Sequence, residues 1–196
     1  MRKIHRLLSS CRRGYFKYLY LCTLNHKIRK IRRKETIRVL FAVAESATWK
    51  NDSLYRAMLM HPGFTPLILV LPDEQKEESL KWEGVDTCFD FFRNKGYTCS
   101  YPYENGKLIN IRKALNPDII FYQKPYTYYP ESFLYRRNLN ALFCYTNYAF
   151  HSLLADWANK NDFFQLVWQN YYENESGFTD LKRKYPEAAS NIAVSY

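Results

Sequence analysis

Residues 36–44 read TIRVLFAVA, a nearly continuous run of β-branched and apolar side chains. Such a run predicts a strand buried on both faces, which is typical of a parallel sheet. Residues 65–72 (TPLILVLP) and 118–123 (DIIFYQ) have the same character. Residues 51–61, which lie between the first two runs, have the pattern of a helix. Strands and helices alternate along the chain, so we expect an α/β fold with a mostly parallel sheet flanked by helices.

The same alternation continues to the end of the chain. The other expected helices cover residues 77–95, 109–115, 130–138 and 177–185, and the other expected strands cover residues 97–101, 140–145 and 191–196. In the first of these helices we expect Phe89, Phe91 and Phe92 to face inward and Gly96 to end the helix. A strand at the last residues predicts that the chain is a fragment, because natural termini more often fray.

The basic side chains are concentrated at the N-terminus. The chain of 196 residues has 29 Lys and Arg, 19 Asp and Glu, and a net charge of +10. Residues 1–40 hold 13 of these bases and one acid, a net charge of +12, so the other residues have a net charge of −2. We therefore divide the chain into a basic arm (1–35) and a near-neutral domain (36–196), truncated at its C-terminal end.

The arm has the pattern of a basic amphipathic helix, with an expected interruption near Gly14. Three partners for its apolar stripe are open: an anionic membrane surface, the domain itself, or nucleic acid. The aromatic residues of the stripe favour the membrane surface. The stripe consists of Ile4, Leu7, Leu8, Cys11, Tyr15, Tyr18, Leu19, Cys22, Ile28 and Ile31, and the expected membrane contacts are Arg6, Arg12, Arg13, Tyr15, Phe16, Lys17 and Leu19.

The arm has no segment that predicts a membrane span or export. Residues 15–24 (YFKYLYLCTL) are its most apolar stretch, but they number ten and include Lys17, whereas a spanning helix needs about 20 apolar residues. No small-residue cleavage site follows this stretch. The expected location is therefore cytoplasmic, on the inner face of the cell membrane.

Several kinds of site are disfavoured by the absence of their motifs. The five cysteines show no CxxC spacing and no Cys/His cluster, which argues against a disulfide framework and a zinc site. The sequence has no GxGxxG, Walker A, GxSxG or HExxH motif, and only six glycines. A glycine-rich phosphate cradle is therefore not expected, and neither is a cofactor or metal.

Polar side chains follow the expected strands at their carboxyl ends, where parallel sheets bind ligands. Glu45 could orient a substrate hydroxyl or cap a helix. His151 could take a proton from an acceptor hydroxyl or serve as a structural histidine. The tyrosines could line a cleft or pack a corner. The candidate catalytic residue is His151, and the candidate substrate-binding residues are Glu45, Trp49, Tyr122, Gln123, Tyr126 and Asn147.

Four segments together resemble the CDP-glycerol glycerophosphotransferase family. They are RVLFAVAESATWKNDSLYRAM (38–58), FFRNKGY (91–97), LNPDIIFYQKPY (115–126) and FCYTNYAFHS (143–152). The resemblance covers about residues 36–196. It depends most on WKNDSLY (49–55) and on the string PDIIFYQ-PY.

The resemblance implies a transferase of GT-B architecture, with two Rossmann-like halves and the active site between them. Family members move a polyol phosphate from a CDP-activated donor to a hydroxyl of a cell-envelope polymer. This chain is similar to the N-terminal, acceptor-side half only, so the donor would be bound by a missing C-terminal half. The acceptor of this half would be an envelope polymer or a lipid-linked acceptor. His151 matches the family histidine without its flanking Trp and Gly. The alternatives are a non-catalytic membrane-tethered interaction module and a nucleic-acid-binding protein.

Overall fold

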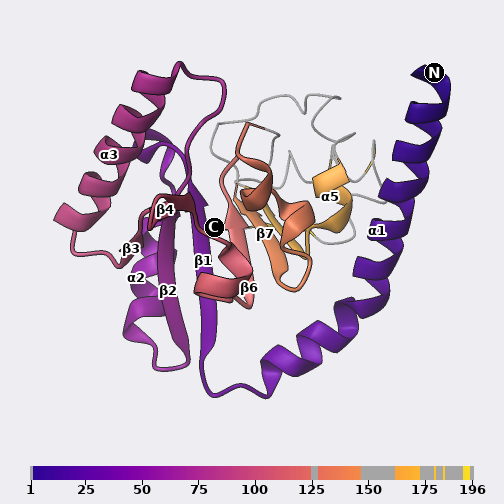
Figure 1. Ribbon diagram of the computed structural model, residues 1–196. Helices are drawn as coiled ribbons and strands as arrows, with labels where there is room; N and C mark the ends of the chain where they lie inside the picture. The colour runs from indigo at the N-terminus through magenta and orange to yellow at the C-terminus, as the bar shows by residue number, and fades with distance from the viewer. Residues whose placement is uncertain are drawn as a thin grey trace.

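The computed structural model describes residues 2–124, 128–146, 162–172, 179, 183 and 192–194. Within these residues, seven strands form one parallel sheet in the order β3-β2-β1-β6-β7-β8-β9 (Figure 1). This confirms the predicted α/β, Rossmann-like fold. The strands are β1 (Ile37–Val43), β2 (Phe64–Val70), β3 (Cys99–Ser100), β6 (Ile119–Tyr122), β7 (Leu142–Thr146), β8 (Gln169–Tyr172) and β9 (Ile192–Val194).

The direction in which the sheet grows reverses at β1. The chain first adds β2 and β3 on one side of β1, and it then returns to add β6, β7, β8 and β9 on the other side. β1 therefore pairs with β2 and β6, and the loops that follow β1 and β6 leave the sheet in opposite directions. A crevice at such a switch point is where open α/β sheets bind ligands.

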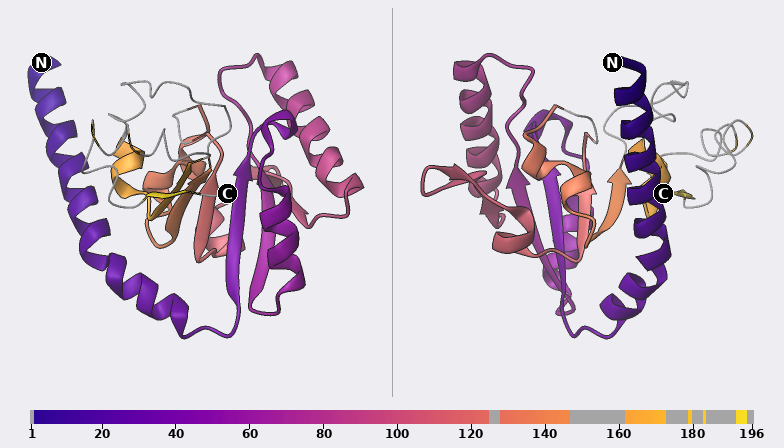
Figure 2. Two further views of the ribbon diagram at one scale, coloured as in Figure 1. Left: turned by 180° about the vertical axis from the view of Figure 1, so that it is seen from behind. Right: turned by 45° about the vertical axis from the view of Figure 1, so that its right-hand side comes forward.

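Helices cover both faces of the sheet (Figures 1 and 2). The described helices are α1 (Arg2–Arg32), α2 (Asp52–Met60), α3 (Glu78–Asn94) and α5 (Asp162–Leu166). Single turns lie between the strands: η1 (Ser46–Thr48), η2 (Ile111–Leu115), η3 (Glu131–Phe133) and η4 (Tyr135–Arg137). A separate hairpin is made of β4 (Tyr103–Glu104) and β5 (Lys107–Leu108).

α3 ends where the sequence predicts, at Gly96, which has φ = +76°. The Gly96 N–H donates to the Arg93 carbonyl and the Tyr97 N–H donates to the Phe92 carbonyl, at 2.9 and 3.0 Å. These two bonds form a Schellman motif, in which glycine adopts the left-handed backbone at little cost. The Tyr97 and Phe92 rings stack at 6.2 Å and close the motif.

The central strands separate two layers of the core. Along β1, Val39, Phe41 and Val43 face one layer, while Leu40 and Ala42 face the other. All five are buried, which confirms that the run at 36–44 is a strand covered on both faces.

Two expected helices are short turns in the structure, and one expected side-chain orientation in a third helix is wrong. The segment at 109–115 is the single turn η2, because Asn116 adopts φ = +42° ahead of a proline that disfavours helix. The segment at 130–138 forms η3 and η4 rather than one helix. In α3, Phe92 is buried but Phe91 is exposed, because adjacent helical positions cannot share one face. The helix expected at 177–185 lies largely outside the described residues.

Two strand features were not predicted. β8 has the polar start Gln169–Asn170, and it is a strand because β7 and β9 pair with it on both sides. The β4–β5 hairpin turns at Asn105–Gly106, with φ values of 52° and 73°. An Asn-Gly pair is the usual signal for this tight turn, so the sequence does contain the evidence for the hairpin.

α1 is one continuous helix, so the interruption expected near Gly14 is wrong. Its C-terminal half packs on the sheet through Tyr20, whose ring stacks on Phe143 at 5.0 Å with an interplanar angle of 2°. The Tyr20 hydroxyl accepts a hydrogen bond from the Phe143 N–H at 3.3 Å. The Lys27 ammonium lies 3.8 Å from the centre of the Tyr20 ring, and burial lowers the pKa of Lys27 to about 8.

The single apolar stripe predicted for the arm is therefore split between two faces. Ile31 is buried and Ile28 packs against the core, on the same face as Tyr20. Tyr15 and Tyr18 lie on the other face, 61% and 66% exposed. Packing on the domain is confirmed for the C-terminal half of α1, and its outer face remains available to a partner.

Among the described residues, no helix is both long enough and apolar enough to cross a membrane.

Candidate functional site

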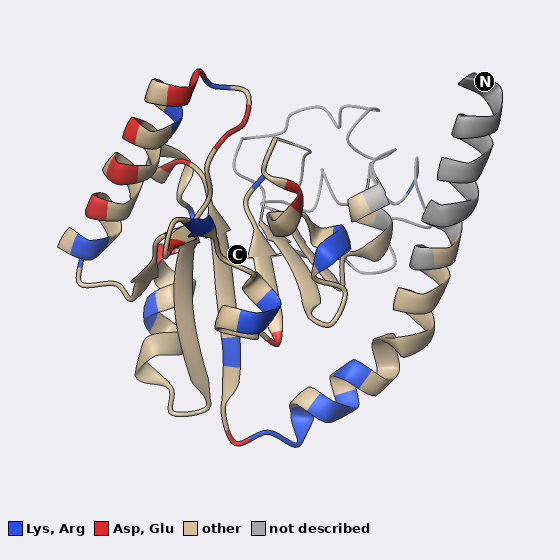
Figure 3. Cartoon of the chain, viewed as in Figure 1, with Lys and Arg blue, Asp and Glu red and all other residues tan. Residues whose placement is uncertain are grey.

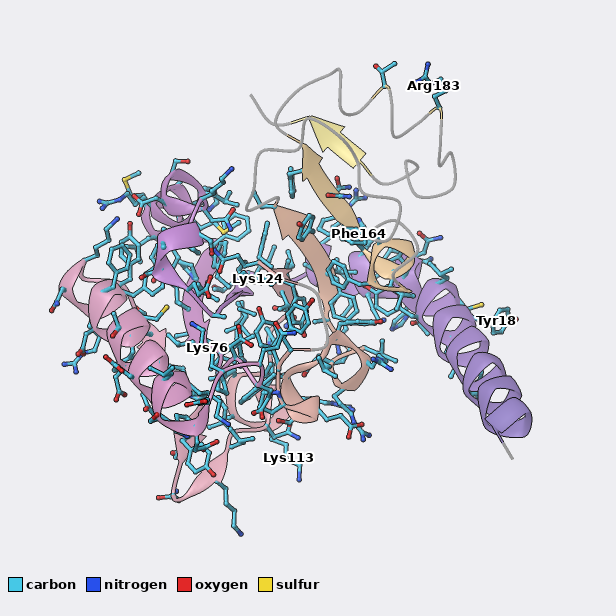
Figure 4. The ribbon with its side chains drawn as sticks, turned by 90° about the horizontal axis from the view of Figure 1, so that it is seen from above. Tyr18, Lys76, Lys113, Lys124, Phe164 and Arg183 are labelled. Atoms are coloured by element: carbon cyan, nitrogen blue, oxygen red, sulfur yellow. The ribbon has the colours of Figure 1, made fainter. Side chains whose placement is uncertain are left out.

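The candidate site lies at the carboxyl ends of β1 and β6, on either side of the switch point. Glu45 follows β1 and Lys124 follows β6, and the Lys124 Nζ donates to Glu45 Oε2 at 2.6 Å. Lys76, from the loop between β2 and α3, lies 3.4 Å from Glu45 Oε1. Figure 4 looks onto this edge of the sheet, with both lysines labelled near the middle of the view. One carboxylate thus connects three loops at this edge of the sheet.

Glu45 acts as an ion-pair partner and not as a helix cap. It occupies the position before η1, but its side chain makes no capping hydrogen bond. The hydrogen bond from Lys124 is the main reason that the pKa of Glu45 is lowered, with a smaller contribution from Lys76. Glu45 is therefore a carboxylate at neutral pH, suited to accept hydrogen bonds from hydroxyl groups and not to donate a proton.

Gln123 lies directly beyond β6 and is 4% exposed. Its backbone N–H donates to the Ala42 carbonyl at 3.3 Å, which continues the β1–β6 pairing by one residue. Neither its amide nitrogen nor its amide oxygen has a hydrogen-bond partner within the described parts of the chain. A buried polar group without a partner costs about 1–3 kcal/mol, and such a group in a native fold calls for a functional explanation.

Of the predicted cleft residues, Tyr122 lies in the core and Trp49 packs against it. Tyr122 is buried, and its hydroxyl donates to the Phe133 carbonyl at 3.1 Å. The prediction that Tyr122 lines the cleft is wrong, because Tyr122 is the last residue of β6 and its ring packs in the core against Phe143 and Phe163. Trp49 packs edge-on against Phe92 at 5.1 Å, and its indole N–H donates to Asp52 Oδ1 at 3.2 Å.

The remaining predicted site residues, Tyr126, Asn147 and His151, lie outside the described residues. Of the expected membrane contacts on α1, the structure describes the side chains of Tyr15 and Leu19, and both are exposed.

Lys76 and Lys124 were not among the predicted site residues. A signal for both exists in the sequence, since each lies within a few residues of the end of a predicted parallel strand. The carboxyl ends of parallel strands share one edge, so these loops meet where Glu45 lies. The sequence does not show that their ammonium groups reach one carboxylate.

The comparisons with known proteins leave the family open. No protein-family model matches the chain, and no curated protein matches it. One solved structure is similar in fold, a glycosyltransferase from Rickettsia africae ESF-5, with 13% identity and a TM-score of 0.47. The match covers 82% of this chain and 43% of that one, so this chain spans less than half the length of the glycosyltransferase. A likeness at this level says nothing about substrate or mechanism, and the resemblance to CDP-glycerol glycerophosphotransferases stays a prediction.

The ion pair at the site gives a pH-dependent stability. Replacing Glu45 with glutamine is expected to lower the free energy of unfolding by about 1–2 kcal/mol at neutral pH, because Lys124 loses a charge-assisted bond. A free glutamate has a pKa of about 4.3, and the folded value is lower. The contribution of the pair is therefore complete above about pH 5 and is lost as the pH falls through the folded pKa.

Urea unfolding of the unmodified protein and Glu45→Gln across this pH range measures the effect. The two stabilities should converge in acid. A difference that stays constant down to about pH 3 would show that Glu45 contributes through packing and not through its charge.

Proposed function

We propose that this chain is the acceptor-side half of a transferase, and that the crevice beyond β1 and β6 holds a hydroxyl-bearing acceptor. The buried, unpartnered amide of Gln123 is the observation that carries the proposal. A carboxamide donates and accepts hydrogen bonds, as a hydroxyl does. Glu45, which is held ionised by Lys124, the residue after Gln123, adds an acceptor for a second hydroxyl. A polyol or sugar matches these two groups.

The narrower proposal is transfer of a polyol phosphate or a sugar to a cell-envelope polysaccharide. In the polyol case, the acceptor oxygen would attack the phosphorus next to the polyol of a CDP-activated donor. The bond from that phosphorus to the CMP oxygen would break, and His151 would take the hydroxyl proton. Tyr126 and Asn147 would contact the acceptor. The donor would be held by a C-terminal half, as the family resemblance implies.

The two lysines favour an acceptor that carries phosphate. Lys76 and Lys124 bring two ammonium groups to the carboxylate of Glu45. A phosphate of the acceptor polymer would accept charge-assisted hydrogen bonds from such ammonium groups. A glycerol phosphate polymer combines this phosphate with the hydroxyls that Gln123 and Glu45 fit.

The acceptor is attached to the envelope, so we place the protein at the inner face of the cell membrane. The exposed face of α1 would contact anionic lipid, with the bases of the arm supplying attraction of about 1 kcal/mol each near the surface. A non-catalytic module tethered in the same way is the alternative.

A pair of matched variants tests acceptor binding at the crevice. Glu45→Gln breaks the 2.6 Å pair with Lys124 at the carboxyl edge of the sheet, and Asp118→Asn breaks the 2.6 Å pair with Lys34 ahead of β6, at the opposite edge. By calorimetry with a glycerol phosphate oligomer, Glu45→Gln should bind at least about tenfold more weakly, a change of about 1.4 kcal/mol. Asp118→Asn should bind as the unmodified protein does.

The same protein should release no CMP from CDP-glycerol when it is assayed alone. CMP release would place the donor site in this half and would contradict the acceptor-side assignment. Equal loss of oligomer binding in the two variants, or no binding by the unmodified protein, would favour the non-catalytic module.

A further inference from the structure

A hollow of about 310 Å³ lies beside the C-terminal half of α1. The described residues that line it are the basic residues His26, Arg29, Lys30 and Arg33, and the carbon atoms of their side chains form most of its wall. Arg29 Nε donates to the Asn25 carbonyl at 3.3 Å, which leaves the other donors of its guanidinium for a ligand. None of the four side chains pairs with a carboxylate in the part of the chain that the structure describes.

The basic residues of the domain are placed differently. Lys95 pairs with Asp52 and Lys124 pairs with Glu45, and most of the other ion pairs also lie within the domain. Figure 3 shows blue and tan but no red along the C-terminal part of α1, whereas α3 carries both red and blue. The helix dipole favours bases in the last turn of a helix, where Arg29 and Lys30 lie, and His26 lies about one turn earlier.

The hollow continues a row of exposed side chains along one face of α1. Positions 15, 18, 22, 26 and 29 of α1, and Arg33 just beyond its end, are separated by three or four residues, the spacing of one helical face. The opposite face carries Tyr20 and Ile31, which are buried against the sheet. Figure 4 shows Tyr18 pointing away from the domain. The outer row is therefore aromatic in its first half and basic in its second.

We infer that this hollow binds the phosphate group of an anionic phospholipid, with the outer face of α1 lying on the bilayer surface. Arginine binds phosphate oxygens through two parallel hydrogen bonds, and Arg29 and Arg33 are one helical turn apart. The exposed rings of Tyr15 and Tyr18 would lie at headgroup level, where the amphipathic tyrosine side chain is favoured. This inference rests on the membrane attachment proposed above and adds its ligand.

The order of side chains along α1 favours lipid over nucleic acid. A protein surface that binds nucleic acid needs Lys and Arg side chains spaced along the whole length of the bound phosphate backbone. The basic part of the row is short, because it extends only from Arg33 back to His26. The row from Tyr18 to Arg33 is roughly 22 Å long. An aromatic and apolar stretch beside a compact basic hollow matches a headgroup above acyl chains.

Vesicle flotation with a matched pair of double variants tests the inference. Arg29→Gln/Arg33→Gln removes two charges from the hollow, and Arg32→Gln/Arg112→Gln removes two exposed charges outside it. On vesicles of phosphatidylcholine with phosphatidylglycerol, the hollow variant should bind about 30-fold more weakly, as expected for two bases at an anionic surface. The control variant should stay within about threefold. Thermal unfolding of both variants checks that each is folded.

Competition with soluble glycerol 3-phosphate separates the hollow from general attraction. The competitor should weaken vesicle binding of the unmodified protein and leave the residual binding of the hollow variant unchanged. Equal losses in the two double variants would overturn the inference. Glycerol 3-phosphate binding without vesicle binding would also overturn the inference, in favour of a site for free phosphate. A larger loss of duplex DNA binding than of vesicle binding in the hollow variant would overturn it as well. Oligomer binding at Glu45 is a separate measurement, so failure here leaves the acceptor proposal standing.

Discussion

Replacing Tyr20 with alanine is expected to lower the free energy of unfolding by about 3–5 kcal/mol, the usual cost of removing a large buried ring. Tyr20 is 1% exposed and stacks on Phe143 in the middle of the sheet. Its hydroxyl also accepts the Phe143 N–H, so Tyr20→Phe should lower the stability by about 1–2 kcal/mol by leaving that donor without its partner. Urea unfolding followed by circular dichroism measures both changes.

Tyr18 provides the control on the same helix. Tyr18→Ala removes the same side chain from a position that is 66% exposed, and the stability should change by no more than about 0.5 kcal/mol. Equal small effects at both positions would show that α1 is a detachable arm and not part of the folded domain. A large effect at Tyr20 alone would show that the domain needs α1 from Tyr20 onward.

Replacing Gln123 with leucine is expected to raise the stability by about 1–2 kcal/mol and to weaken acceptor binding at least about tenfold. The amide is buried without a hydrogen-bond partner among the described residues, so its removal relieves a desolvation cost. The same change removes the group that we propose contacts the acceptor. A gain in stability with a loss of binding is the signature of a side chain kept for function.

Asn138 gives the contrast for this experiment. It is also a buried amide, 1% exposed, but its Nδ2 donates to the Leu134 carbonyl at 2.9 Å. Asn138→Leu should therefore lower the stability by about 2 kcal/mol, because a buried carbonyl loses its donor. If Gln123→Leu destabilises the protein as much as Asn138→Leu does, the Gln123 amide serves the fold rather than a ligand.

The two faces of α1 reconcile two of the alternatives that the sequence leaves open. One face carries Tyr20 and Ile31 into the core, and the opposite face carries Tyr18 and the basic hollow. Packing on the domain holds the helix in place, which would present the outer face to a surface without the entropy cost of ordering a free arm. Membrane binding would then depend on the fold of the domain.

The local pattern of the sequence was enough for most of the elements. The β-branched run at 36–44 is β1, the helix at 77–95 is α3, and Gly96 ends it. These features depend on side-chain period and on one backbone angle, and both are local. β8 was missed because its polar start has little strand propensity of its own, and its neighbours in the sheet decide its conformation.

The sequence by itself determined the α/β class, the concentration of bases in residues 1–40 and the edge of the sheet at which Glu45 lies. Only the tertiary structure decided that β6 pairs with β1, which brings Lys124 within 2.6 Å of Glu45. It also decided that Tyr122 packs in the core and that the neighbouring Gln123 amide is buried without a hydrogen-bond partner among the described residues. Strand pairing joins residues 79 positions apart in sequence, here Glu45 and Lys124, and no local pattern records such a contact.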